Sequence, residues 1–167
     1  MDSATIHDGY APGAVGRLTA LHATYYGDLW ELDTAFEAEI AEGIAEFVDR
    51  YDPSKDGLWL VLDDTDQVRG GIIIDSRDIQ TEGAQLRYFI LDPEFQGQGL
   101  GRELLNRAME FCHEHAYERV FLWTVDELEA AISLYEDVGF EATETIDIHT
   151  GWQTEVPYRL FEYTRDY

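Results

Sequence analysis

The sequence predicts an α/β (α+β) fold in which a mixed central sheet of about seven strands is flanked by about four helices. Apolar residues recur at helical spacing in four segments, and they form short alternating or branched runs in seven others. In chain order the segments read β-α-α-β-β-β-α-β-α-β-β, which places helices on both faces of the sheet. The 167 residues are expected to form one domain, 1–167.

The N-terminal elements expected are a short strand at 3–8 and a helix from Pro12 to about Gly27, because proline suits the first turn of a helix. Five apolar residues at helical spacing predict a second helix at 34–50: Phe36, Ile40, Ile44, Phe47 and Val48. Thr34 followed by Glu37 matches a capping box, so we expect Thr34 to cap this helix.

After residue 56 the spacing of apolar residues changes from the helical period to that of strands. Residues 57–64 and 67–75 are apolar, branched runs around an acidic turn, which predicts a hairpin. Residues 84–92 form the next strand, and residues 119–125 are apolar on both faces, as in a buried central strand. Two further strands are expected near the end of the chain, at 140–148 and 154–163.

Two more helices separate these strands. Leucines and small apolar residues at helical spacing predict a helix from about Gly99 to His115. The next helix follows Asp126 and Glu129, both of which are candidate capping residues. Gly139 is expected to end it in a positive-φ conformation.

Three glycines alternate between the strand at 84–92 and the helix after it, in Gln96-Gly97-Gln98-Gly99-Leu100-Gly101. The first amides of a helix lack internal partners and lie at the positive end of its dipole. Glycines let bare backbone approach a phosphate there. The segment therefore predicts a pyrophosphate site, with Arg102 and the more distant Arg107 as cations. The alternative is a glycine-rich turn without a ligand.

The spacing excludes two common phosphate loops. No Gly-Lys-Ser/Thr follows, as a nucleotide P-loop requires. Gly101 also does not stand where the third glycine of the dinucleotide fingerprint would, and Arg102 occupies that place.

The segment resembles the coenzyme A loop of the GNAT superfamily of N-acetyltransferases, with the core pattern Gln/Arg-x-x-Gly-x-Gly/Ala. Residues 96–101 fill this pattern, and Leu91-Asp92-Pro93 precedes it as is usual there. AAISLYEDVGF at 130–140 resembles the tyrosine-bearing helix of the same superfamily. The resemblance covers about 57–163 and implies a GNAT fold, acetyl-CoA as cofactor and N-acetyltransferase activity.

A narrower resemblance is to the acetyltransferase half of MarR-type regulator–GNAT fusion proteins, through LRYFIL at 86–91 and LWTVDELEAAISLYEDVGF at 122–140. The chain is too short for the MarR half, so a stand-alone version is expected. One departure is the absence of the Asn that many members have near the start of the tyrosine-bearing helix. Here that region reads Val125-Asp126-Glu127-Leu128, so this coenzyme A contact is expected to be missing or made by backbone.

The resemblance also implies site residues. Tyr135 matches the tyrosine that protonates the leaving thiolate, although a core tyrosine explains its spacing equally well. The Leu91 amide would stabilise the thioester oxyanion. The residues expected to bind the cofactor are Phe89, Ile90, Leu91, Gln96, Gly97, Gln98, Gly99, Leu100, Gly101 and Arg102. Among these, the resemblance implies that the backbone of Phe89, Ile90 and Leu91 pairs with the pantetheine arm.

The base that receives the proton of the amine is left open by the sequence. Gln85 occupies the approximate place of a Glu that serves in some relatives, and an amide cannot act as a base. Glu37, Glu82 and His149 are candidates, each with a solvated or structural role as the alternative. Arg87 would pair either with an acidic neighbour or with a substrate carboxylate, because an unpaired buried charge is costly.

The helical segment 1–56 is expected to form the acceptor side, and 57–167 the acetyl-CoA-binding core. Tyr26, Trp30 and Phe36 would wall the acceptor pocket, and residues 149–153 would supply a lid with Trp152. Aromatic residues at such positions are also common in cores and oligomer contacts.

The chain carries 35 Asp and Glu against 11 Lys and Arg, a net charge of −24. This charge argues against nucleic acid and anionic membranes as partners. It indicates either attraction of a cationic substrate or adaptation to high salt, and the even spread of acidic residues favours a halophilic, acidic protein. No signal peptide or apolar span is seen, so a cytoplasmic protein is expected. No metal site is predicted, and Cys112 has no disulfide partner.

The function that follows is acetyl-CoA-dependent transfer of an acetyl group to a primary amine of a small molecule or peptide, by direct attack. The alternatives are a non-catalytic acetyl-CoA-binding sensor and an interaction module. The exposed-looking final strand predicts that the chain can form a homodimer.

Overall fold

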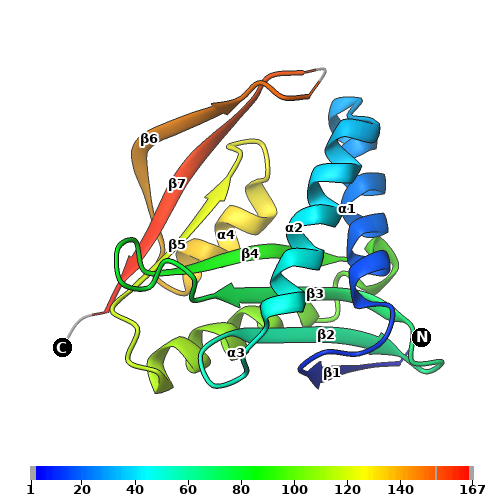
Figure 1. The fold of residues 1–167 in the computed structure, drawn as a ribbon, viewed down its shortest axis with the longest axis horizontal. Helices are drawn as coiled ribbons and strands as arrows, with labels where there is room; N and C mark the ends of the chain where they lie inside the picture. Colours follow the sequence, from blue (N-terminus) through cyan, green and yellow to red (C-terminus); the bar gives the residue numbers. More distant parts are fainter. Residues whose placement is uncertain (1–2, 153, 166–167) are drawn as a thin grey trace.

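The computed structural model describes residues 3–152 and 154–165. Its strands form one seven-stranded sheet in the order β1-β2-β3-β4-β5-β7-β6 (Figure 1). In chain order they are β1 Ala4–Asp8, β2 Gly57–Asp63, β3 Val68–Asp75, β4 Ala84–Leu91, β5 Arg119–Thr124, β6 Glu141–His149 and β7 Val156–Thr164. The helices of this part of the chain are α1 Ala14–Trp30, α2 Thr34–Arg50, α3 Leu100–Glu114 and α4 Glu129–Asp137, with a 3₁₀ turn at Pro93–Phe95.

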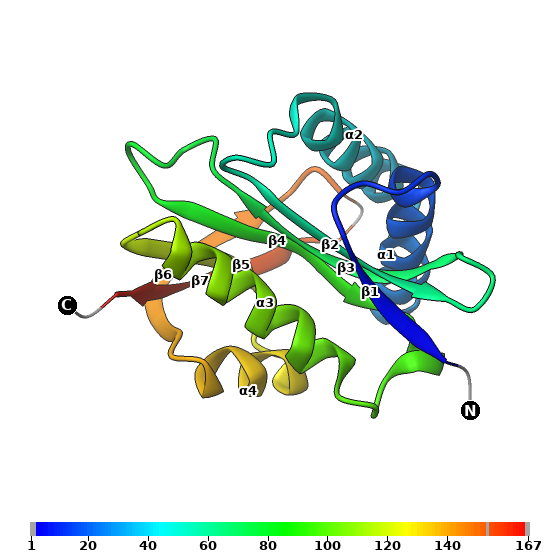
Figure 2. The same ribbon diagram turned by 90° about the horizontal axis from the view of Figure 1, so that it is seen from below.

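The helices cover both faces of the sheet, as predicted. Figure 2 shows α1 and α2 on one side and α3 and α4 on the other. Successive side chains of β2 point to opposite faces of the sheet, and the helices bury both of these faces. Leu58 and Leu60 pack with residues of α1 and α2, whereas Trp59 and Val61 pack with residues of α3.

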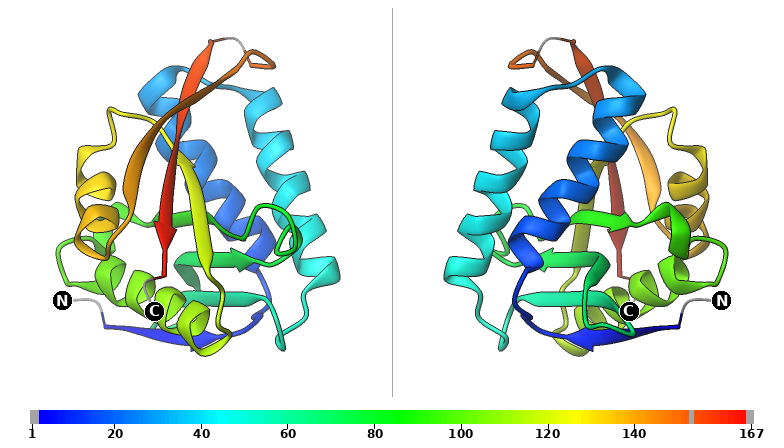
Figure 3. Two further views of the ribbon diagram at one scale, coloured as in Figure 1. Left: turned by 90° about the vertical axis from the view of Figure 1, so that its left-hand side faces the viewer. Right: turned by 90° about the vertical axis from the view of Figure 1, so that its right-hand side faces the viewer.

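The sheet splits between its two central strands. β4 and β5 run parallel, and their register joins only Ala84 to Val120 and Gln85 to Phe121. Beyond Gln85 the strands diverge, so β1–β4 and the group β5, β7 and β6 run in clearly different directions (Figure 3). The split leaves one edge of β4 without a neighbouring strand in the described part of the chain.

A β-bulge shapes the same stretch of β4. Its register against β3 slips between Gly71 and Ile73, where Tyr88 adopts a φ of 54°. Such a φ is rare for a bulky residue and turns the strand locally. Gly43 of α2 accommodates the bulge, because a Cβ at that position would collide with the Tyr88 hydroxyl.

Several local predictions need correction. Asp33, not Thr34, is the N-cap of α2, and its side chain accepts a hydrogen bond from the Ala35 amide at 3.4 Å. The N-cap of α4 is Leu128, without a side-chain cap. Asp126 instead pairs with Arg159 at 2.9 Å.

The end of α1 differs from its prediction, and the end of α4 agrees with it. α1 continues beyond Gly27 to Trp30, and its C-cap residue Glu31 has a φ of 55°. Gly139 follows α4 with a φ of 110°, as predicted.

The final strand is not an edge. β7 lies between β5 and β6, and β6 is the outer strand. Ile146 and Ile148 of β6 are about half exposed. A dimer formed through a strand edge would therefore use β6, and the prediction that names the final strand is wrong.

Candidate active site

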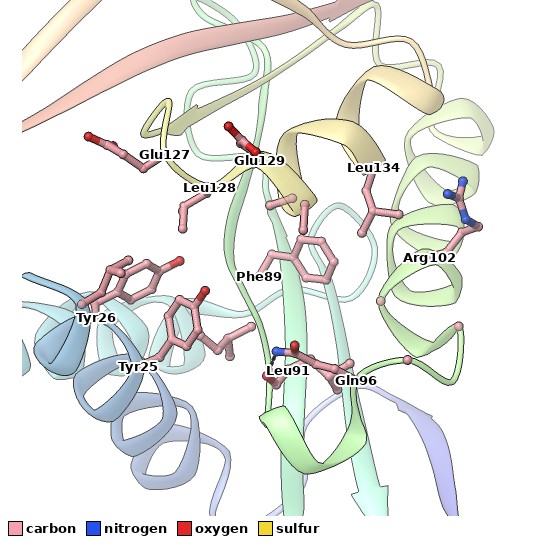
Figure 4. A pocket seen from close by; sticks show the side chains of 17 residues that line it. Tyr25, Tyr26, Phe89, Leu91, Gln96, Arg102, Glu127, Leu128, Glu129 and Leu134 are labelled. Carbon is pink, nitrogen blue, oxygen red and sulfur yellow. Dashed lines mark hydrogen bonds between the residues drawn. The ribbon is translucent and has the colours of Figure 1, made fainter.

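A cavity of about 590 Å³ lies between α1, the end of β4, the glycine loop and the start of α4. In Figure 4, Tyr25 and Tyr26 approach this space from α1, Phe89 from β4 and Leu134 from α4. Its lining residues are Tyr25, Tyr26, Leu29, Phe89, Ile90, Leu91, Gln96, Gly97, Gly99, Gly101, Arg102, Glu127, Leu128, Glu129, Ala130, Ala131 and Leu134. We call it the first cavity.

The glycine loop presents bare backbone to this cavity. Gly97 and Gly99 have φ values of 84° and 81°, which favour glycine, and a Cβ on either would meet nothing within 4 Å. Gly99 is the N-cap of α3, so the unpaired amides of that helix begin here. Empty space before a helix N-terminus fits a pyrophosphate group. The donor set and the open cradle therefore fit the phosphates of a coenzyme.

Not every predicted loop residue reaches the cavity. Gln96, Gly97, Gly99, Gly101 and Arg102 line it. Gln98 is exposed away from it, and the side chain of Leu100 is buried in the core under α3. Those two residues can contribute only through their backbone.

Gln96 holds the loop against the strand that precedes it. Its Nε2 donates a hydrogen bond to the Leu91 carbonyl at 3.1 Å. The Asp92 amide donates to the Arg69 carbonyl of β3 at 2.7 Å. Because successive peptide groups of a strand point to opposite edges, the Leu91 N–H points away from β3 and toward the opening. The Ile90 backbone then faces β3, so its predicted pairing with the pantetheine arm does not fit this register.

The first cavity has little positive charge. Arg102 lines it but pairs with Asp137 at 2.8 Å, and Glu127 and Glu129 also line it. Arg107 pairs with Glu103 at 3.0 Å and does not line the cavity. Helix-end amides must therefore hold an anionic ligand against an acidic background.

A second cavity of about 240 Å³ opens where β4 and β5 diverge. It shares Tyr26, Phe89, Leu128 and Ala131 with the first cavity, so the two meet at these residues. The rest of its lining consists of His22, Trp30, Phe36, Ile40, Gln85, Leu86, Arg87, Tyr88, Leu122, Trp123, Thr124, Val125, Tyr135 and Tyr158.

Tyr135 of α4 lines the second cavity. Its side chain is 6% exposed, and its ring packs against Phe89 and Phe140 at centroid distances of 6.1 and 5.9 Å. Burial, and then the nearby Tyr26, raise the pKa of the Tyr135 hydroxyl above its usual value. The group therefore keeps its proton at neutral pH and can donate it.

His22 is a residue that the sequence analysis missed. It is buried on α1 and lines the second cavity. Its Nδ1 lies 2.7 Å from the Leu18 carbonyl, and a carbonyl can only accept, so Nδ1 carries the hydrogen and Nε2 a lone pair. Burial lowers the pKa of His22 to about 4, so the ring is neutral at pH 7. The spacing of Leu18, His22 and Tyr26 on one helix face is the signal that could have found it.

Arg87 pairs with an acidic neighbour, which was one of its two predicted roles. Its Nη1 donates to Asp75 Oδ2 at 2.9 Å, and its Nη2 donates to the Tyr88 hydroxyl at 2.8 Å. Arg87 also lines the second cavity, next to Gln85.

Predicted acceptor residues separate into two groups. Tyr26, Trp30 and Phe36 line the second cavity. Trp152 lies behind Phe36 at a centroid distance of 4.9 Å and stacks on His149, which pairs with Glu39 at 3.1 Å.

The candidate bases lie elsewhere. Glu37, Glu82 and His149 do not line either cavity. The last residue of the expected lid, Gln153, lies outside the described residues. Among the described residues, no cluster of His, Cys, Asp and Glu forms a metal site, and no helix is long and apolar enough to cross a membrane.

Comparison with known proteins shows the family of the chain. The model of the acetyltransferase (GNAT) family matches residues 18–140. This match spans more than half of the chain, and the chain therefore belongs to the GNAT acetyltransferase family. The predicted family is thereby confirmed, and the members of this family are named as acetyltransferases.

Curated relatives match part of the chain. An N-acetyltransferase of Methanocaldococcus jannaschii is 35% identical over 71 residues, which cover 42% of this chain and 30% of that protein. YjgM of Escherichia coli is 32% identical over 91 residues, 54% of each. Mycothiol acetyltransferase of Beutenbergia cavernae is 37% identical over 93 residues, 54% of this chain and 29% of the relative. The chain thus spans about half or less of the length of these relatives.

Solved structures share the fold over nearly the whole chain. A GNAT acetyltransferase of Staphylococcus aureus Mu50 superimposes with a TM-score of 0.73 at 15% identity and covers 97% of this chain and 99% of its own. Salmonella typhimurium yncA, solved with its cofactor acetyl-CoA, gives 0.68 at 16% identity, with coverage of 99% and 95%. These likenesses confirm the predicted GNAT fold.

Replacement of Gly101 by Val is expected to weaken acetyl-CoA binding by about 10–100-fold, because added methyl groups would crowd the loop wall. Gly101 has an ordinary helical φ, and a Cβ there would lie 3.8 Å from Phe89 and Leu134. Valine at Gly99 would strain the backbone as well, so Gly101 gives the cleaner test. Gly16→Val is the matched control, since Gly16 is an exposed helical glycine with open space around it. Calorimetric titration showing equal affinity for both variants would contradict the loop assignment.

Acetyl-CoA affinity is expected to rise as KCl is raised from about 0.05 to about 1 M, because salt shortens the Debye length from more than 10 Å to about 3 Å. The reason is the acidic wall formed by Glu127 and Glu129, together with a net charge of −24. Phosphate sites built from cations show the opposite trend. Titrations at several KCl concentrations, with NaCl as a second salt, measure it. Affinity that falls with salt would show that cations dominate the site.

Proposed function

We propose that the chain transfers an acetyl group from acetyl-CoA to a primary amine of a small molecule or peptide, by direct attack. The observation that carries this proposal is the meeting of two cavities at Tyr26, Phe89, Leu128 and Ala131. The first cavity has the phosphate cradle, and the second has room for an acceptor. An amine in the second cavity would thus reach a thioester at the junction.

The acyl donor, the oxyanion and the leaving thiolate each have a group in place, and the proton that the amine nitrogen loses as the amide forms would pass to solvent. Acetyl-CoA supplies an activated acetyl group as a thioester. The Leu91 N–H, at the open edge of β4, would donate to the developing oxyanion. Tyr135, which keeps its proton at neutral pH, would protonate the leaving thiolate.

His22 is assigned a positioning role toward the amine. Its neutral ring has the lone pair on Nε2, which can accept an amine N–H and direct the amine lone pair toward the acetyl group. A group with a pKa of about 4 holds a proton weakly. The acceptor amine is therefore used in its neutral form, with no lining carboxylate as its base among the described residues of the second cavity.

The division of labour along the chain follows the cavities. His22, Trp30, Phe36 and Ile40 belong to the segment 1–56 and line the second cavity, which supports an acceptor-side role for this segment. The glycine loop and α4 belong to 57–167. The boundary between 1–56 and 57–167 separates two roles and not two folding units, because β1 of the first segment pairs with β2 of the second.

The identity of the acceptor, the location of the protein and its assembly are also proposed. The names of the relatives do not select one acceptor: they include mycothiol acetyltransferase and, in Danio rerio, N-acetylaspartate synthetase, 31% identical over 78% of this chain and 45% of that protein. A cytoplasmic location, a homodimer, adaptation to high salt and the likeness to MarR-type fusion proteins are likewise proposed.

Two measurements test the proposal. Titration with acetyl-CoA is expected to show binding, and an assay of thiol release over a panel of primary amines is expected to show turnover. Binding without thiol release from any amine would favour a non-catalytic sensor. No binding at all would favour an interaction module.

A further inference from the structure

Arg87 is held in a fixed position at one end of the second cavity. Two of its nitrogens bond to Asp75 and to the Tyr88 hydroxyl, and its guanidinium carbon lies 4.6 Å from the centre of the Tyr88 ring. A guanidinium group has five N–H donors, so these two bonds leave donors free for a ligand.

The charge around Arg87 is not balanced by its neighbours. Asp75, only 2% exposed, already receives both Nη atoms of Arg50, at 3.0 and 2.6 Å. Arg50 also contacts Glu46, which in turn pairs with Arg77. Three guanidinium groups therefore share two carboxylates. In a chain with 11 basic against 35 acidic residues, this local positive excess is unusual.

The second cavity supplies nothing that would cancel this charge. Its described lining residues include no Asp or Glu. Glu39 of α2 is exposed and pairs with His149, and it affects the pKa of Tyr88 and Tyr158 only as a lesser cause. A partly buried cation that faces a cavity without a full counter-charge is costly, unless a ligand supplies the missing negative charge.

The cavity has an apolar end as well as a cationic end. Trp30, Phe36 and Ile40 form the apolar end. A Cβ on Gly43 would lie 3.7 Å from Nη2 of Arg87, which fixes the cationic end beside that residue of α2. The rise of about 1.5 Å per helical residue separates the levels of Phe36 and Gly43 by about 10 Å.

We propose that the acceptor amine also carries a carboxylate and an apolar or aromatic side chain, as an apolar α-amino acid does, and that Arg87 binds this carboxylate. This inference rests on the proposed N-acetyltransferase function. Arg87 would be a specificity-determining residue, with its guanidinium oriented by Asp75 and Tyr88. A carboxylate would complete its hydrogen bonds, while the side chain of the acceptor fills the aromatic end.

Matched acceptors test the inference in the wild-type enzyme. Phenylalanine is compared with phenethylamine and phenylalaninamide, which lack the carboxylate. We expect kcat/KM to be about 10–100-fold higher for phenylalanine, the usual value of a charge-assisted contact. The α-amine of phenylalaninamide is less basic than that of phenylalanine, so a larger fraction of it is neutral and able to attack. This difference works against the expected preference for phenylalanine. Equal or better use of either analogue without a carboxylate would overturn the inference while leaving amine acetylation intact.

Variants separate carboxylate binding from general damage. Arg87→Gln is expected to lower kcat/KM for phenylalanine far more than kcat/KM for phenethylamine, so that the ratio between the two acceptors falls to about one. Asp75 keeps both bonds from Arg50, so no buried carboxylate is orphaned. Arg77→Gln is the control, because Arg77 is half exposed and lies outside the cavity. Equal losses for both acceptors in Arg87→Gln would overturn the assignment. Acetyl-CoA binding without turnover of any amine would instead refute the proposed function.

Discussion

Tyr135→Phe is expected to lower turnover by roughly 10²–10⁴-fold, the usual contribution of a positioned proton donor. The change removes one hydroxyl and keeps the ring that packs against Phe89 and Phe140. Acetyl-CoA binding and the melting temperature should therefore stay near those of the wild type. Steady-state kinetics, with calorimetry for binding, measure the two effects separately.

The pKa of Tyr135 sets the pH dependence of this step. Because burial raises the pKa of its hydroxyl, the protonated donor is present throughout the neutral range, and its loss should not appear in the rate below about pH 10. A wild-type rate that declines between about pH 6 and 9 because Tyr135 loses its proton would contradict the raised pKa of this residue.

Tyr117→Phe is the matched control for Tyr135→Phe. The Tyr117 hydroxyl donates to the Lys55 carbonyl at 2.6 Å, and neither residue lines a cavity. Its loss should cost about 0.5–1.5 kcal/mol of unfolding free energy and leave turnover unchanged. If Tyr135→Phe behaves like Tyr117→Phe, Tyr135 is a core residue, and the thiolate leaves without a dedicated acid.

The element order could be predicted because periodicity records which side of each segment is buried. Leu104, Leu105 and Ala108 line one face of α3, and the branched run of β2 is buried on both sides. Helix caps could not be predicted as well. Asp33 and Thr34 are adjacent residues that can both cap a helix, and local sequence does not decide between them.

The cofactor side of the site was more predictable than the acceptor side. Gly97, Gly99 and Gly101 lie within a few residues of one another, so a local pattern identifies them. The second cavity arises where β4 and β5 diverge beyond Gln85. That opening depends on strands that are far apart in sequence, and His22 enters it from a third element. The partner of Arg87 was equally hidden, because Asp75 lies on the neighbouring strand.

Leu91→Pro is expected to lower turnover by about 10²–10³-fold, the usual effect of removing one oxyanion donor. Proline removes the N–H of residue 91. The neighbouring Asp92 amide bonds to Arg69 of β3, so the Leu91 N–H lies at the opposite, open edge of β4. Proline is tolerated at strand positions whose N–H faces away from the ladder. The hydrogen bonds between β3 and β4 should therefore survive.

Leu91→Ala provides the control, because it truncates the same half-buried side chain and keeps the N–H. The ratio of kcat between the Ala and Pro variants isolates the amide from the loss of packing. Circular dichroism and thermal melts of both variants show whether β4 remains in the sheet. If the two folded variants turn over at similar rates, the oxyanion is stabilised by another group. The open edge of β4 would then serve only to seat the acyl donor, and the chemistry would depend on the residues at the junction of the two cavities.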